Sequence, residues 1–446
     1  MAEYHVENFG CRASRSDGEA IAAGLRHRGL APAGGFSTAS VVVVNTCSVT
    51  AEADRAARAF IRRVHRRNPQ AKIVVTGCYA QRAPEEVAEI EGVTSVIGNS
   101  HKSLVVPEIT EPSSFVPLAH LVNNIPVLHD ENFAHAELAE LSFAEDAHQT
   151  RPNLKVQDGC ANRCSFCIIP ETRGPSRSVS LAECLDSVNR FAENGGQELV
   201  LSGINLGRWG RDLNPQQRFS DLIAAIVEQT SLPRLRLSSI EPMDWTPELL
   251  ALFAQYASPG KLARHAHLPL QSGSDTILRK MHRRYRPWHY AGKLNQIRSL
   301  MPDAAIGADV MIGFPGETDA LFRESYDFIA AQPFTYLHLF PFSARPGTPA
   351  AALHRESPVP ARAVEERIAA LRKLNREKNH AFRKSFTGRE LSVVTLEGTQ
   401  NGLAPALSDN FLKIEIETDL PANRTIIVQA TGLTEDGILA IPVSSL

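Results

Sequence analysis

The sequence has no apolar run long enough to cross a bilayer and no excess of charge of either sign. No stretch approaches the ~18 apolar residues of a membrane span, and 47 Lys and Arg nearly balance 49 Asp and Glu. The first residues lack the basic segment and apolar stretch of a signal peptide. We therefore expect no membrane-spanning helix and a cytoplasmic location, and any nucleic-acid surface must be local.

Cysteine is scarce, with seven in 446 residues. An odd number without a signal peptide argues against a disulfide framework, and clustered cytosolic thiols are typical metal ligands or nucleophiles. Cys160, Cys164 and Cys167 form a CxxxCxxC loop, whose soft thiolates suit an iron–sulfur cluster or zinc. Three thiolates leave one iron of a cubane open to a ligand that is not protein. The alternative is a zinc knuckle with a fourth ligand elsewhere, although no His or Cys follows at finger-like spacing.

The first hundred residues alternate between expected strands and helices. Strands are expected at residues 4–9, 41–46 and 72–77, and helices at 17–28, 50–67 and 84–90. This alternation indicates an α/β fold with a parallel, doubly wound sheet. Cys11, Cys47 and Cys78 each follow a strand, and the carboxyl ends of parallel strands share one ligand-binding edge, so we expect these thiols to converge. The alternative is three separately buried cysteines that act as small hydrophobes, as we expect for Cys184.

The rest of the chain predicts three further regions. Residues 103–150 contain no Lys or Arg but eight Asp or Glu, which indicates a linker with few secondary elements. Six strand–helix repeats follow, enough for a partial (βα)6 barrel, and then a basic helix at 361–386. Period-two strands at 391–396, 411–417 and 425–430 predict a small antiparallel β-barrel. The expected domains are 1–110, a linker at 111–150, the barrel with its basic helix at 151–386, and the β-barrel at 387–446.

These motifs resemble a known family. The CxxxCxxC loop with Phe166 before its last cysteine resembles the signature of radical S-adenosylmethionine (SAM) enzymes. The single cysteines upstream and the C-terminal barrel resemble the added domain and the TRAM domain of the methylthiotransferase subfamily. Residues 45–54, 156–159 and 173–177 look like the branch that acts on N6-threonylcarbamoyladenosine in tRNA. Later segments agree with this branch: 237–242, 267–274, 307–309 and 316–318.

The resemblance implies an enzyme with two [4Fe–4S] clusters. Cys160, Cys164 and Cys167 would hold the cluster that binds SAM, and Cys11, Cys47 and Cys78 an auxiliary cluster, the site of sulfur delivery. Cleavage of SAM would give a radical that removes the hydrogen from C2 of the adenine ring, and a second SAM would supply the methyl group. The partners would be tRNA, a flavodoxin-type electron donor and a sulfur donor, with no membrane. The alternatives are another tRNA adenosine or a ribosomal protein as substrate, or a non-catalytic Fe–S RNA-binding protein.

Two further sets of residues are candidates for binding. Cofactor contacts are expected at Phe166 and at the strand ends, where each residue is equally explained as a turn or helix cap: Ser202, Gly203, Glu241, Gln271, Ser272, Gly313 and Gly316. RNA contacts are expected at cationic side chains, for which a solvated surface is the alternative: Arg55, Arg58, Arg62, Arg66, Arg283 and Arg284. The last 60 residues have three basic and eight acidic side chains, which is unusual for an RNA clamp.

Overall fold

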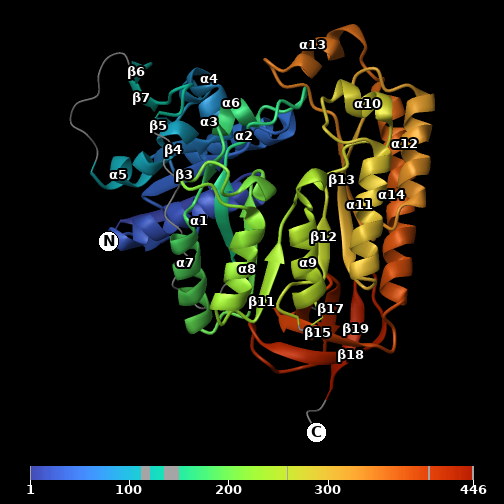
Figure 1. Cartoon of the computed structure of the whole chain (residues 1–446). Coiled ribbons are helices and arrows are strands. Elements are labelled where there is room, and N and C mark those ends of the chain that lie inside the picture. Colours follow the sequence, from blue (N-terminus) through green and yellow to red (C-terminus); the bar gives the residue numbers. More distant parts are fainter. Residues whose placement is uncertain (1, 112–120, 135–149, 259, 400–401, 444–446) are drawn as a thin grey trace. The chain divides into compact units, whose positions relative to one another are not determined.

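Two units divide the chain, and neither is a single continuous segment. The computed structural model describes residues 2–111, 121–134, 150–258, 260–399 and 402–443 (Figure 1). Unit 1 comprises Met1–Ala144, Lys155–Val179 and Ser343–Ala351, and unit 2 comprises Glu145–Leu154, Ser180–Phe342 and Ala352–Leu446. This division differs from the domain boundaries expected at 110, 150 and 386, because residues 155–179 pack with the N-terminal sheet. No helix in the described ranges has the length and apolarity of a membrane span.

Unit 1 is built on one sheet with the strand order β2-β1-β3-β4-β5-β7-β6, in which all pairs but β6–β7 are parallel. The strands are β1 (Glu3–Asn8), β2 (Ala31–Pro32), β3 (Val41–Thr46), β4 (Lys72–Gly77), β5 (Val93–Gly98), β6 (Leu121–Val122) and β7 (Ile125–Leu128). The helices are α1 (Arg12–His27), α2 (Ala51–Arg67), α3 (Cys78–Arg82), α4 (Pro84–Ala88), α5 (Val105–Thr110) and α6 (Ile169–Arg173), with the 3₁₀ turn η1 (Asn99–Leu104).

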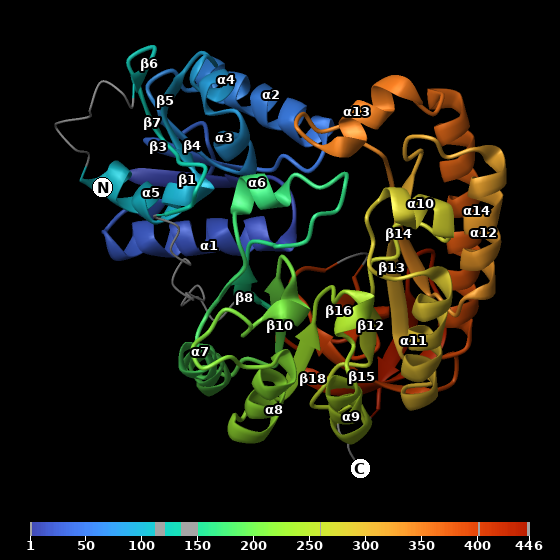
Figure 2. The ribbon, with the colours of Figure 1, turned by 45° about the horizontal axis from the view of Figure 1, so that its top comes forward.

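Alternate side chains of the β3 strand place helices on both faces of this sheet. Val42 and Val44 pack in the cluster that contains α2, and Val41 and Val43 pack in the cluster with α1 and α5. Figure 2 shows α1 on one side of the strands and α2 and α3 on the other. The expected doubly wound sheet is confirmed. Within the expected linker 111–150, β6 and β7 extend the sheet, and residues 112–120 and 135–149 lie outside the described residues.

Six strands form the expected partial barrel: β8 (Asn153–Asp158), β10 (Glu198–Gly203), β11 (Arg234–Leu237), β12 (His265–His267), β13 (Ala305–Ile312) and β14 (Tyr336–Pro341). The β10–β11, β12–β13 and β13–β14 pairs are parallel, and a bridge from Leu235 to Leu262 joins the two sheets. The helices are α7 (Leu181–Glu193), α8 (Phe219–Gln229), α9 (Pro247–Tyr256), α10 (Asp275–Lys280), α11 (Pro287–Leu300), α12 (Asp319–Ala331), α13 (Pro349–Glu356) and the basic α14 (Ala361–Lys384).

A closed five-stranded barrel follows, in the order β15-β16-β17-β19-β18. Its strands are β15 (Glu390–Thr395), β16 (Ala404–Ser408), β17 (Lys413–Ile416), β18 (Thr425–Leu433) and β19 (Ile438–Pro442). The β17–β19 pair is parallel, so the barrel is not entirely antiparallel as expected. It covers the starts of the barrel strands: Arg264 forms an ion pair with Asp409, and Phe411 stacks on His265 with ring centroids 4.4 Å apart. These contacts place it at the end opposite the strand carboxyl edge.

Glu198, at the start of β10, is a fully buried anion where the partial barrel meets the closed five-stranded barrel. It pairs with Arg151, Arg234 and Arg236, and Arg236 also donates to the Ser408 carbonyl at 2.9 Å. Burial alone would raise the pKa of Glu198, but the arginines, with Arg236 foremost, lower it to about 2. Since the pKa is depressed, the stabilisation is present above the ordinary value near 4.5 and is lost as the pH falls through about 2.

Glu198→Gln should therefore destabilise unit 2 by about 3–5 kcal/mol at neutral pH, because three arginines lose their buried partner. The measurement is the urea midpoint at pH 7, with Glu193→Gln on the exposed end of α7 as the matched control. The wild-type advantage should shrink progressively below pH 4.5. Equal midpoints for the two variants at pH 7 would contradict this role.

Candidate functional site

The three single cysteines lie at the carboxyl edge of the unit 1 sheet. Cys11 precedes α1, Cys47 follows β3, and Cys78 is the first residue of α3. The strand order reverses between β1 and β3, and such a switch point is where open parallel sheets bind ligands. A Cβ on Gly10, where φ is +107°, would lie 2.7 Å from the Cys47 Sγ. Glycine therefore lets the β1 turn approach Cys47 closely.

Cys47 has the other two single cysteines as electrostatic neighbours. The pKa of Cys47 is raised to about 12, chiefly by burial, and the neighbouring thiols of Cys78 and Cys11 contribute to this rise. Cys47 and Cys78 are buried and Cys11 is exposed. Asn99 donates to the Cys78 Sγ at 3.4 Å. The structure therefore places all three cysteines at the same edge of the sheet, and their convergence on one cluster remains a prediction.

The Cys160, Cys164 and Cys167 loop connects β8 to α6, also in unit 1. None of the three forms a disulfide, and all are partly exposed. The Asn162 amide donates to the Cys160 Sγ at 3.4 Å, a contact that favours a thiolate. Gly159 has a φ of +73°, and a Cβ there would lie 1.9 Å from the Pro175 carbonyl oxygen. Only glycine allows this approach, which brings residues 156–159 against 173–177.

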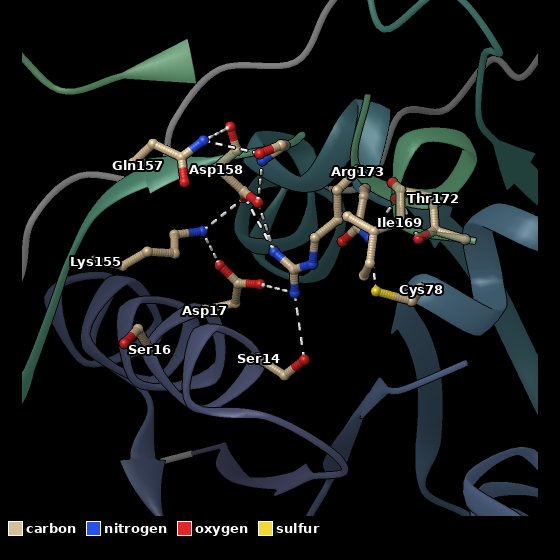
Figure 3. A network of polar contacts seen from close by, with 12 residues as sticks. Ser14, Ser16, Asp17, Cys78, Lys155, Gln157, Asp158, Ile169, Thr172 and Arg173 are labelled. Carbon is tan, nitrogen blue, oxygen red and sulfur yellow. Dashed lines mark hydrogen bonds and ion pairs between the residues drawn. The ribbon is translucent and has the colours of Figure 1, made fainter. Parts of the chain in front are cut away.

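A fully buried ion network joins this loop to α1 (Figure 3). Arg173 donates to both carboxylate oxygens of Asp158, at 2.9 and 3.0 Å, and to Asp17 at 3.0 Å. Lys155 bridges the same two carboxylates, and Lys102 pairs with Asp17 at 2.6 Å. Burial alone would raise the pKa of Asp17, but Lys102, Lys155 and Arg173 hold it below its usual range.

This network continues to both sets of cysteines. Arg173 donates to the Ser14 hydroxyl at 3.2 Å, which lies 3.7 Å from the Cys11 Sγ. Asp158 is two residues before Cys160. The network has three cations against two anions, an excess of one positive charge in the protein interior. Because an uncompensated buried charge is costly, this excess favours an anionic group near Arg173, which has Cys78 and Cys11 as electrostatic neighbours.

Residues Ser343–Ala351 form a strap that contacts both cysteine regions of unit 1. Arg345 is buried and donates to the Ser48 hydroxyl at 3.1 Å, next to Cys47, and it pairs with Asp54. The Ala350 amide donates to the Ser165 carbonyl at 2.9 Å, inside the CxxxCxxC loop. The strap therefore holds the loop after β3 and the loop after β8.

The expected cofactor residues of unit 2 gather at the carboxyl ends of successive strands. Ser202 and Gly203 end β10, Glu241 follows β11, Gln271 and Ser272 follow β12, and Gly313 and Gly316 follow β13. Phe166 is partly buried in unit 1.

Three of these residues have a positive φ, and a fourth, Glu241, has a raised pKa. Gln271 has a φ of +64°, and its amide oxygen is buried without a hydrogen-bond partner among the described residues. Glu241 pairs with the buried Arg283, yet burial raises its pKa above the usual value. Gly313 and Gly316 both have positive φ, as tight turns require. The edge thus offers an orphaned acceptor and a carboxylate.

The expected RNA contacts divide into paired and exposed side chains. Arg58 donates to the Tyr79 hydroxyl at 2.8 Å and to Glu86 at 2.9 Å, and Arg55 pairs with Glu52. Of the four α2 arginines expected to contact RNA, Arg62 and Arg66 are exposed and form no ion pair within the described ranges.

The second basic group divides in the same way. Arg283 is buried, pairs with Glu241 and lies over Tyr285 at 4.9 Å, so it is not a surface contact for RNA. Arg284 is exposed.

The parallel partial barrel and the CxxxCxxC loop at its first strand define a radical SAM enzyme. Residues 154–329 match the model described as the Radical SAM superfamily, and residues 3–98 match Uncharacterized protein family UPF0004. A radical SAM methyltransferase, TsrM from Kitasatospora setae, has the same fold, with a TM-score of 0.58 at 17% identity over 79% of this chain and 77% of that chain. Membership implies SAM and a [4Fe–4S] cluster.

Curated relatives narrow the family. The chain is 33% identical to a threonylcarbamoyladenosine tRNA methylthiotransferase MtaB from Bacillus subtilis, over 93% of this chain and 90% of that protein. It is 35% identical to an MtaB from Aquifex aeolicus, over 92% of this chain and 96% of that protein. A tRNA-2-methylthio-N(6)-dimethylallyladenosine synthase from Parafrankia sp. is 32% identical to the chain, over 89% of this chain and 78% of that protein. The chain belongs to the methylthiotransferase family of radical SAM enzymes.

The donor set fits the cluster that this family implies. Cys160, Cys164 and Cys167 are unbridged thiols on one loop with a backbone amide directed at the first. Soft thiolates are the ligands of [4Fe–4S] clusters. In unit 2, the acceptor groups at the strand ends face the side where barrel enzymes bind substrates.

Proposed function

We propose that this protein inserts a methylthio group at C2 of N6-threonylcarbamoyladenosine in tRNA. The observation that supports this most directly is the gathering of two separate cysteine triplets in one unit, linked by the buried Asp17–Arg173–Asp158 network. A radical SAM enzyme needs one triplet, and a second convergent triplet offers a separate place for the sulfur to be added. The relatives named for threonylcarbamoyladenosine support this substrate.

Each region of the chain has a defined part in this proposal. Cys160, Cys164 and Cys167 hold the [4Fe–4S] cluster that, when bound, supplies the electron for SAM cleavage. Cys11, Cys47 and Cys78 hold an auxiliary cluster, and the positive charge on Arg173 stabilises its thiolates. Residues of unit 2 at the strand ends orient SAM, with Glu241 and the free Gln271 oxygen as acceptors for its ammonium group. A flavodoxin-type reductant and an external sulfur source complete the reaction.

The activity should appear on RNA that contains threonylcarbamoyladenosine. Anaerobic enzyme, SAM, dithionite and sulfide are incubated with an anticodon stem-loop with that base, and nucleosides are analysed by mass spectrometry. We expect a product heavier by a methylthio group in place of one hydrogen, and no product from Cys164→Ala. SAM cleavage without any RNA product would contradict the proposal.

A second candidate substrate is N6-dimethylallyladenosine, because the Parafrankia relative is named for it. The same assay on a stem-loop with this base separates the two. Methylthiolation of the dimethylallyl RNA alone would replace the proposed substrate and leave the reaction class unchanged. The structural alternative, a non-catalytic RNA-binding protein, predicts no SAM cleavage with either RNA.

A further inference from the structure

One segment of unit 2 is strongly basic in a chain whose charges nearly balance. Residues 276–302 contain seven Lys or Arg and no Asp or Glu. The segment includes most of α10, the following turn and all of α11. The turn before α11 lies at the carboxyl edge of the strands, since in a βα unit the chain leaves the strand there and returns through the helix. The five cations at positions 279–286 are therefore at the edge where SAM is expected, whereas Lys293 and Arg298 lie further along α11.

Trp288, in the first turn of α11, is 59% exposed, whereas Trp209 and Trp245 are 0% and 1% exposed. Its only ring contact among the described residues is with His289, which meets it edge-on with centroids 5.6 Å apart. A single exposed apolar side chain is ordinary on a protein surface. This one is distinguished by its cationic surroundings and its position at the edge that binds ligands.

The turn between α10 and α11 buries one of its cations, Arg283, and leaves its neighbour Arg284 exposed to solvent. His282 has a φ of +56°, and this left-handed residue separates the inward Arg283 from the helix before it. Arg279 and Arg286 share one carboxylate, Asp275, at 2.8 and 3.3 Å. The exposed members form a surface that we name the α10–α11 patch: Arg279, Lys280, His282, Arg284, Trp288 and His289.

We propose that the α10–α11 patch binds a single-stranded segment of the RNA substrate, with one base stacked on Trp288 and the adjacent phosphates on Arg284 and its cationic neighbours. Aromatic platforms flanked by cations are how proteins hold unpaired nucleotides. A protein partner or a membrane would need a larger apolar area than one indole. This inference rests on the proposed function, because an RNA substrate must place an unpaired loop at this edge.

Trp288 provides its own probe, because the other two tryptophans are buried. Titration of the anaerobic holoenzyme with an anticodon stem-loop should quench the exposed tryptophan fluorescence, and acrylamide quenching should fall in the complex. Trp288→Ala should weaken binding about tenfold or more, and Trp288→Phe should restore most of it. Arg284→Gln should reduce the salt slope of the affinity by about one.

Leu300→Ala is the matched control, since Leu300 is 41% exposed at the other end of the same helix. Its affinity for RNA and its SAM cleavage without RNA should both equal those of the wild type. If the wild type binds and modifies RNA but Trp288→Ala binds equally well, the patch is overturned and the proposed function stands. If the wild type neither binds nor modifies RNA, the proposed function fails with it.

Discussion

Anaerobic reconstitution of the wild-type protein should give about eight irons per chain, and Cys11→Ala/Cys47→Ala/Cys78→Ala should give about four. The reason is their placement: all three cysteines lie at the carboxyl edge of the unit 1 sheet, and Cys47 has both other thiols as electrostatic neighbours. Iron and sulfide are counted chemically, and the electron paramagnetic resonance signal of the reduced protein is recorded. The triple variant should retain one cluster and still cleave SAM.

Cys184→Ala is the control for this experiment. Cys184 is fully buried in α7, and burial raises the pKa of its thiol to about 12, so it stays protonated. This variant should keep about eight irons. The complementary triple variant at Cys160, Cys164 and Cys167 should also keep about four, but without SAM cleavage. Four irons in the wild type and in the N-terminal variant alike would show that the single cysteines bind no cluster.

Asp17→Asn should be among the most destabilising single changes in unit 1, at about 3–5 kcal/mol. It removes one of two carboxylates that neutralise Lys102, Lys155 and Arg173, and leaves three buried cations with a single anion. Because the pKa of Asp17 is depressed, its stabilisation is present at neutral pH and is lost as the pH falls below the ordinary aspartate value. The measurement is the urea midpoint of the apo protein at pH 7.

Arg173→Met gives the informative comparison, because it removes the excess positive charge and leaves two cations with two anions. The apo protein should lose less stability than with Asp17→Asn, whereas the cluster expected on the single cysteines should be lost faster in air or chelator. Glu89→Gln, at an exposed helix end, should leave both properties unchanged. A milder effect of Asp17→Asn than of Arg173→Met on the apo protein would contradict this charge balance.

The sequence predicts the strands of this fold where apolar residues are continuous. The valine run at 41–46 forms β3 with the expected bounds. The apolar run at 72–77 forms β4, also with the expected bounds. By contrast, the sequence does not predict β5, β16 or β19. Thr94 and Ser95 interrupt the apolar run of β5, and alanine and proline shorten the apolar runs of β16 and β19. α1 begins at Arg12 rather than at Asp17, because its first turn is polar.

The cysteines could be found by spacing, but the groups that connect them could not. Asp17 and Arg173 are 156 residues apart, and neither belongs to a recognisable local motif. The Arg58 side chain has its partners on other elements, Tyr79 and Glu86, which helical spacing cannot indicate. The only available signal for the network was the resemblance of segments 156–159 and 173–177 to one branch. The structure gives that resemblance a physical basis in the Asp158–Arg173 pair.

The strap Ser343–Ala351 has a consequence for the synthesis of the chain. A domain usually folds as its residues leave the ribosome, from the N-terminus onward. Unit 1 cannot do so, because it needs residues 155–179 and then the strap, which emerges only after most of unit 2. Both cysteine triplets are therefore translated long before Arg345 closes over Ser48 and Asp54. A nascent chain that ends before Ser343 lacks the contacts that Arg345 makes with Ser48 and Asp54 beside Cys47.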